Sequence, residues 1–197
     1  MEMVLQNPVR EQKAVSDGII GMIFLLATEA MFFAGLISAY IVNRAGIPVW
    51  PPVGQPRLPI EVTAVNTAIL IASAVAIFLF RKNIIANFNK GNKSLKLLVT
   101  TILLGGTFLA IQGTEWVRLI GYGLTTTSSL YGSFFYVIIG VHAVHVVAGL
   151  AILFYLFKAI KNSATLEIAK NKITVCSMYW YFVVGIWPIL YMLVYLM

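Results

Sequence analysis

The chain has 197 residues, of which 60% are hydrophobic and only 11% are charged, and its mean hydropathy is +0.90. Soluble domains carry about 25% charged residues, so this composition excludes a soluble globular domain and predicts an integral membrane protein. The formal net charge of +7 does not indicate nucleic-acid binding, because the basic residues lie in short connections between apolar segments, where they determine membrane topology.

Five apolar segments are long enough to cross a bilayer, whose hydrocarbon core of ~30 Å requires about 20 helical residues. In lipid the backbone must satisfy its own hydrogen bonds, so these segments are expected to be helices. The sequence predicts an all-α integral membrane protein with a single membrane domain over residues 18–197. Its five transmembrane helices are expected at residues 18–42, 62–80, 97–122, 131–157 and 173–197.

The polar segment 1–17 precedes the first span and lacks the basic start of a cleavable signal peptide, so an uncleaved anchor is expected. Eleven of the 14 Lys and Arg residues fall in this segment and in the second and fourth connections; three fall on the opposite side. The positive-inside rule therefore predicts a cytoplasmic N-terminus and a C-terminus outside.

The first connection, residues 45–59, contains Trp50, Pro51 and Pro52, followed by two further prolines. Proline at this density prevents a helix and favours a stiff, extended path along the outer surface. Trp50 is expected to lie in the headgroup layer, where tryptophan is enriched.

Few polar residues that could carry chemistry lie within the spans. They are Glu29 in the first, Gln112 and Glu115 in the third, and His142 and His145 in the fourth. Glu29 and His142 are each eleven residues from the start of their span, which places both near mid-depth. Glu115 comes late in its span, where water and Arg118, three residues on, are expected to reach it. A carboxyl group at the depth of Glu29 costs several kcal/mol, roughly 2.5–3.5 on insertion scales for the related Asp.

The two histidines, His142 and His145, are the only ones in the chain. They are three residues apart on one helix and cannot clamp the two faces of a haem. A metal site would need Glu29 or Glu115 and still more ligands. We therefore expect no cofactor or metal in this chain, and expect both histidines to hydrogen-bond to neighbouring helices or to a partner subunit.

Glu29 allows two interpretations from its position alone. It could be a protonated acid bonded within the bundle, or it could serve a proton relay or a lipid headgroup. Small residues at four-residue spacing predict that one face of this helix packs closely against another helix, and a similar stripe occurs on the third span. The stripes are Ala30, Ala34 and Ser38, and Gly106, Ala110 and Gly113 or Thr114.

Several motifs, in order and with matching spacing, resemble subunit III of haem–copper terminal oxidases (cytochrome c oxidase), in its short five-helix bacterial form. They occupy residues 28–35, 50–54, 59–62, 66–67, 112–116, 131–136, 140–146 and 179–183, together with Trp187. The chain departs from the family at Tyr181 and Val184, where members often have His and Asp. Many members also have seven helices, and this chain starts where their third would.

The resemblance implies an accessory subunit without a redox centre of its own, in an oxidase that reduces oxygen to water and pumps protons. Haems and copper would belong to the partner subunits. It also implies binding to subunits I and II, support of proton uptake and lasting activity in subunit I, and phospholipids held in a cleft. Assembly into a respiratory supercomplex is compatible with it. The expected location is the bacterial inner (plasma) membrane, and the polar residues Glu29, Glu115, His142 and His145 match those of the family.

Other interpretations remain open. Within the family, the chain could serve a quinol oxidase or a nitric oxide reductase complex, because other subunits select the electron donor. From a different class, it could be a small proton-coupled transporter that uses Glu29, which would require polar, water-lined faces on several helices. It could also anchor a b-type cytochrome.

Overall fold

The computed structural model describes residues 16–86, 92–162 and 166–197. These residues form five long helices and a closing π-helical turn, with no strand among them. In chain order they are α1 (Asp17–Ala45), α2 (Ile60–Ala86), α3 (Asn92–Gly121), α4 (Leu130–Lys161), α5 (Leu166–Tyr191) and η2 (Met192–Leu196). Each of the five helices contains a stretch long and apolar enough to span a membrane. The predicted all-α, five-span fold is therefore confirmed, whereas the orientation of the termini stays a prediction.

The helices extend beyond the predicted spans, mainly at the lysine-rich end of the bundle. α2 continues to Ala86 and α3 already begins at Asn92, whereas the predicted spans end at residue 80 and begin at residue 97. At the same end α4 continues to Lys161 and α5 begins at Leu166. Apolar content marks only the part of a helix inside hydrocarbon, and the backbone hydrogen bonds of a helix are equally satisfied in the headgroup layer.

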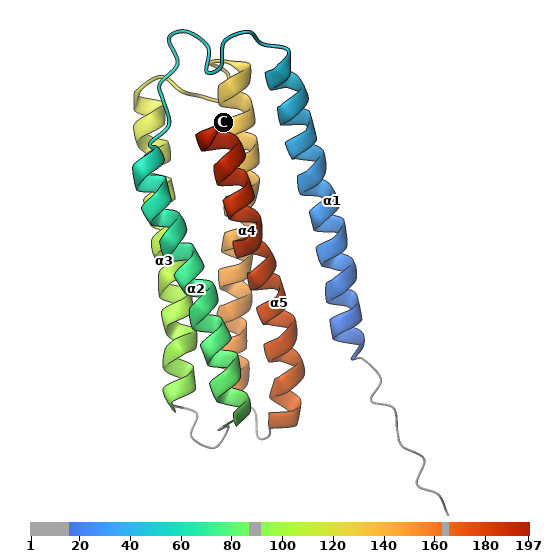
Figure 1. The fold of residues 1–197 in the computed structure, drawn as a ribbon. Helices are drawn as coiled ribbons and strands as arrows, with labels where there is room; N and C mark the ends of the chain where they lie inside the picture. Colours follow the sequence, from blue (N-terminus) through green and yellow to red (C-terminus); the bar gives the residue numbers. More distant parts are fainter. Residues whose placement is uncertain (1–15, 87–91, 163–165) are drawn as a thin grey trace, which may run out of the picture.

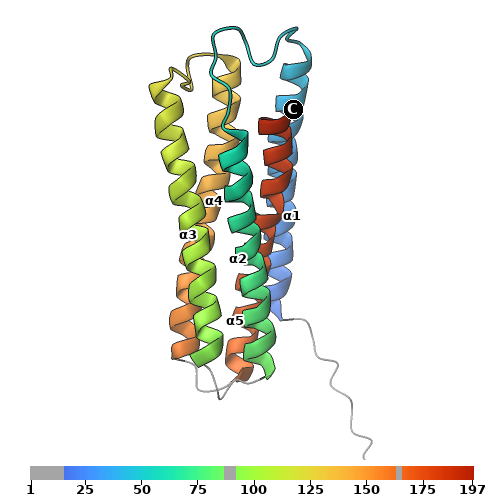
Figure 2. The ribbon, with the colours of Figure 1, turned by 60° about the vertical axis from the view of Figure 1, so that its left-hand side comes forward.

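Helices α2, α3, α4 and α5 pack together, and α1 lies at the edge of this bundle along α5, as Figures 1 and 2 show from two sides. α1 has few contacts with α4 and is the least buried of the five. Only 6% of the residues in its most apolar stretch are buried, against 28–50% in the other helices. The chain alone therefore leaves most of α1 without a protein neighbour.

The small-residue stripes predicted to pack closely do not do so within this chain. α1 turns Phe33 and Tyr40 toward the bundle instead, and these are its buried residues. Small residues show that a face permits close approach, but they do not say whether the chain's own helices occupy it. The stripe residues that are exposed are Ala30, Ala34, Ser38, Ala110, Gly113 and Thr114.

The closest helix packing surrounds Trp180 on α5. A Cβ added to Gly105 on α3 would lie 2.6 Å from the Trp180 ring, and one added to Gly149 on α4 would lie 2.8 Å from it. The indole N–H donates to Ser73 Oγ on α2 at 3.1 Å. One fully buried side chain thus sets the spacing of four helices.

The connection between α1 and α2 is extended, as its prolines predict, and the Trp50–Pro51 peptide bond is cis. Pro52 follows, and its carbonyl accepts a hydrogen bond from the Gln55 N–H. Trp50 packs edge-on between Tyr40 and Tyr131, with ring centroids 5.7 and 5.2 Å away. It is half-buried and holds the connection against α1 and α4.

Candidate functional site

Glu29 of α1 and His145 of α4 form the contact that joins these two helices at mid-depth. His145 Nε2 lies 2.9 Å from Glu29 Oε2, and His145 Nδ1 lies 2.8 Å from the carbonyl oxygen of Val141, one turn earlier. The two side chains are 25% (Glu29) and 14% (His145) exposed, so the pair sits at the edge of the bundle and not in its centre.

These two contacts constrain which nitrogen of the His145 ring donates a hydrogen bond. A carbonyl oxygen only accepts hydrogen bonds, so Nδ1 of His145 must bear the proton that it donates to Val141. One further proton is then shared between Nε2 and Glu29 Oε2. A protonated Glu29 donates it to neutral His145, or an imidazolium donates it to a carboxylate. Both forms keep the hydrogen bond, so the proton can move between Nε2 and Oε2 without rearrangement, whereas its loss to a third group would leave two acceptors facing each other.

His142 lies one turn before His145 and occupies a different environment. Three residues on a helix rotate the side chain by roughly 60° about the axis, so the two imidazoles face different neighbours. His142 is fully buried and stacks on Trp187, with ring centroids 5.0 Å apart, while Phe108 approaches edge-on at 6.2 Å. Phe33 touches both imidazoles.

Within the described residues, the predicted bond to a neighbouring helix is present for His145 and absent for His142, for which the alternative of a bond to a partner subunit stays a prediction. Neither ring nitrogen of His142 has a hydrogen-bond partner among the described residues. Aromatic rings fill the space around it, a property of helix rotation that spacing along one helix does not reveal.

Gln112 and Glu115 on α3 form hydrogen bonds with residues other than Glu29 and His145. Gln112 Nε2 donates to the hydroxyl of Tyr195 in η2 at 2.8 Å. Glu115 accepts a hydrogen bond from Arg118 Nη1 at 2.9 Å, as the three-residue spacing predicts. The Glu115 side chain is only 6% exposed, against 65% for Arg118, so the expectation that water reaches this carboxylate directly is wrong.

The polar residues of α2 were not among the candidate site residues, although Asn66 and Thr67 belong to the family motifs. Trp187 donates its indole N–H to Thr67 Oγ1 at 2.8 Å, and Asn66 Nδ2 donates to the Phe108 carbonyl at 3.1 Å. Asn66 and Ser73 are seven residues apart and so lie on the same face, which is a signal that helical periodicity could have supplied. These groups join helices to one another and do not form a polar, water-lined face.

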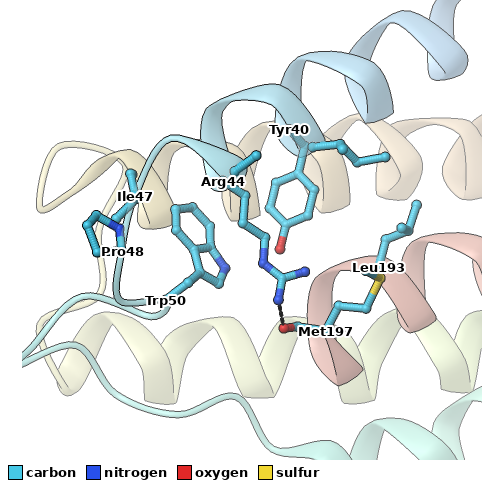
Figure 3. Close-up of a pocket in the computed structure, with 9 residues that line it drawn as sticks. Tyr40, Arg44, Ile47, Pro48, Trp50, Leu193 and Met197 are labelled. Carbon is cyan, nitrogen blue, oxygen red and sulfur yellow. Dashed lines mark hydrogen bonds between the residues drawn. The ribbon is translucent and has the colours of Figure 1, made fainter.

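The lining of a groove of about 520 Å³ comes from α1, the connection after it and the chain's last residues. Figure 3 shows the Arg44 guanidinium reaching between Tyr40 and Trp50 to the main-chain oxygen of Met197. Leu193 and Ile41 supply apolar walls. A cation held among aromatic and aliphatic side chains at the end of a span suits the phosphate and glycerol region of a lipid.

The chain is similar to known proteins over almost its whole length. Residues 6–197 match the family model described as cytochrome c oxidase subunit III. The chain is 36% identical over 179 residues to cytochrome c oxidase subunit 3 of Synechocystis sp., covering 90% of this chain and 74% of the relative. The chain belongs to the cytochrome c oxidase subunit III family.

Two further relatives agree. A probable cytochrome c oxidase subunit 3 of Nocardia farcinica is 34% identical over 182 residues, covering 89% of this chain and 86% of the relative. Cytochrome c oxidase subunit 3 of Homo sapiens is 33% identical over 183 residues, covering 89% and 67% respectively. The five spans make this a multi-pass membrane protein. Membership of the cytochrome c oxidase subunit III family places it in the plasma membrane in bacteria and in a complex with other oxidase subunits.

Both positions where this subunit III departs from the family pattern lie on α5. Val184 is buried in the apolar core, and Tyr181 is half-buried with a hydroxyl that has no hydrogen-bond partner among the described residues. The polar contacts that His and Asp would make there are therefore not reproduced by the residues that this chain carries.

The described residues contain no group of three or more His, Cys, Asp or Glu side chains placed to hold one metal ion. Glu29 and His145 supply two ligands, whereas a protein zinc site uses three or four. Cys176 is buried and free.

Proposed function

We propose that this subunit III is a non-redox accessory subunit of a proton-pumping haem–copper oxidase that reduces oxygen to water. The haems and copper belong to the partner subunits I and II. The chain supports proton uptake by subunit I, prolongs its activity and binds phospholipid. Cytochrome c is the electron donor that the names of the relatives favour over a quinol.

The observation that carries this proposal is the 2.9 Å contact between Glu29 Oε2 and His145 Nε2. The pair lies at the edge of the bundle, and Glu29 belongs to the helix that the rest of the chain covers least. A carboxyl group and an imidazole are the side chains that most often act as proton donors and acceptors in proteins.

The uncovered face of α1 supports assembly with a larger partner. Ala30, Ala34 and Ser38 are exposed on this helix, and small side chains allow a helix of another subunit to approach closely. The groove around Arg44 supports the lipid role, because its cation and apolar walls match the two chemical parts of a phospholipid.

The proposal is tested with Glu29→Gln in the assembled oxidase. The amide keeps a hydrogen bond to His145 but cannot release the shared proton. We expect an unchanged haem spectrum, slower proton uptake and earlier loss of activity during turnover. Glu115→Gln, which alters the acid of the third span, is the matched control and is expected to leave proton uptake unchanged.

Loss of the haem spectrum in Glu29→Gln would contradict an accessory role, and equal proton uptake in both variants and the wild type would contradict a role for the pair. Purification through a tag on this chain provides a second check. Haem-containing oxidase subunits should co-purify, and the donor that sustains turnover, cytochrome c or a quinol, identifies the class of the complex.

A further inference from the structure

A second groove lies at the lysine-rich end of the bundle, on the side formed by α3 and α4. It encloses about 670 Å³ and is open to the surroundings. The residues that line it are Leu95, Lys96, Val99, Thr100, Phe157 and Lys161. Lys96 is in the first turns of α3 and Lys161 ends α4, so both cations belong to the same end of the bundle.

The lining divides into two chemical parts. Lys96 and Lys161 are exposed ammonium groups, whereas Leu95, Val99 and Phe157 form an apolar floor, and no lining residue is acidic. The floor residues belong to helices that continue into the hydrocarbon region, so an occupant with long apolar chains can follow them. Phosphate is the anion that a pair of lysines binds at this depth.

We propose that this groove binds an anionic phospholipid. Its phosphate lies between Lys96 and Lys161, and an acyl chain lies along Val99 and Phe157. The site is built from α3 and α4, whereas the Arg44 groove belongs to α1, the connection after it and the end of the chain. It extends the phospholipid binding of the proposed function to a second site and does not depend on the shared proton.

The simplest alternative is that these lysines only set membrane topology. Two other lysines at the same end make the distinction testable. Lys158 Nζ lies 4.6 Å from the Phe154 ring centroid, and Lys172 Nζ lies 5.8 Å from that of Tyr155, and neither lines the groove. Removing these two changes the net charge of this end equally but leaves the groove intact.

The experiment uses the assembled oxidase in nanodiscs of phosphatidylcholine with a minor fraction of phosphatidylglycerol, and native mass spectrometry counts the retained phosphatidylglycerol. We expect Lys96→Gln/Lys161→Gln to weaken retention roughly thirtyfold, the effect of removing two charges beside a lipid phosphate. The control Lys158→Gln/Lys172→Gln should change it much less. Equal loss in both pairs, or no loss in either, would overturn the proposal.

A measurement on the wild-type complex keeps the test decisive if the double variant fails to assemble. Phosphatidylglycerol with a photoreactive group on one acyl chain is activated in the same nanodiscs, and labelled peptides are mapped. Labelling within residues 95–100 and 157–161 supports the groove. Labelling confined to other helices shows that the lipid binds elsewhere and overturns the assignment.

Discussion

Glu29 and His145 are 116 positions apart in the chain, and Oε2 of one lies 2.9 Å from Nε2 of the other. Because Val141 binds the proton on Nδ1, only one proton remains for the bond between them. The contact gives α1 a polar connection to α4, where the two helices otherwise have few contacts. The same pair of side chains thus holds the proton and attaches α1 to α4.

Replacing Glu29 should therefore affect stability according to whether a hydrogen bond survives. Glu29→Gln retains an N–H that can donate to Nε2, and we expect an unfolding midpoint near that of the wild type. Glu29→Ala leaves Nε2 without its partner and should cost about 1 kcal/mol, at the low end for such losses because water reaches this half-buried site. Thermal unfolding of the purified complex measures both, and equal destabilisation by the two variants would contradict the bond.

The packing around Trp180 predicts a contrast between adjacent glycines. Gly105→Ala would place a methyl group 2.6 Å from the indole ring, and such overpacking costs about 1–3 kcal/mol. Gly106→Ala is the matched control, because nothing lies within 4 Å of its new Cβ and alanine favours the helix. The unfolding midpoint should fall for the first variant and stay or rise for the second.

A second-site change tests whether the ring itself causes this loss. Trp180→Phe shortens the side chain and should recover part of the stability of Gly105→Ala, although it removes the bond to Ser73. If the double variant is as unstable as the sum of the two single variants, Trp180 is not the residue that limits the space at Gly105.

The Glu115–Arg118 pair predicts an asymmetric response, because only the acid is buried. Arg118→Gln leaves a buried carboxyl group without its charged donor and should cost about 1–3 kcal/mol. Glu115→Gln leaves an exposed guanidinium that water solvates and should cost less. Denaturation of the two variants under identical conditions gives the comparison, and a larger effect of Glu115→Gln would show that the burial of the acid is not what matters.

Some features of this protein follow from the sequence alone. Five spans were predictable because the match between apolar length and bilayer thickness is a property of each segment by itself. The i,i+3 contact of Glu115 with Arg118 was predictable for the same reason, since helical spacing brings the two side chains together. The family motifs were likewise readable in order, and the comparisons confirm the membership that they indicate.

Other features were decided by the tertiary structure. The rotation of each helix and its shift against its neighbours decide which side chains meet. They determine the partner of Glu29, the aromatic surroundings of His142 and the exposure of Ala30 and Ala34. Rotation and shift arise from contacts between distant segments, such as Trp180 against Gly105 on another helix. The sequence of one helix does not determine its rotation or its shift. It therefore showed which residues lie on α1, but not which of them would contact His145 and which would remain exposed.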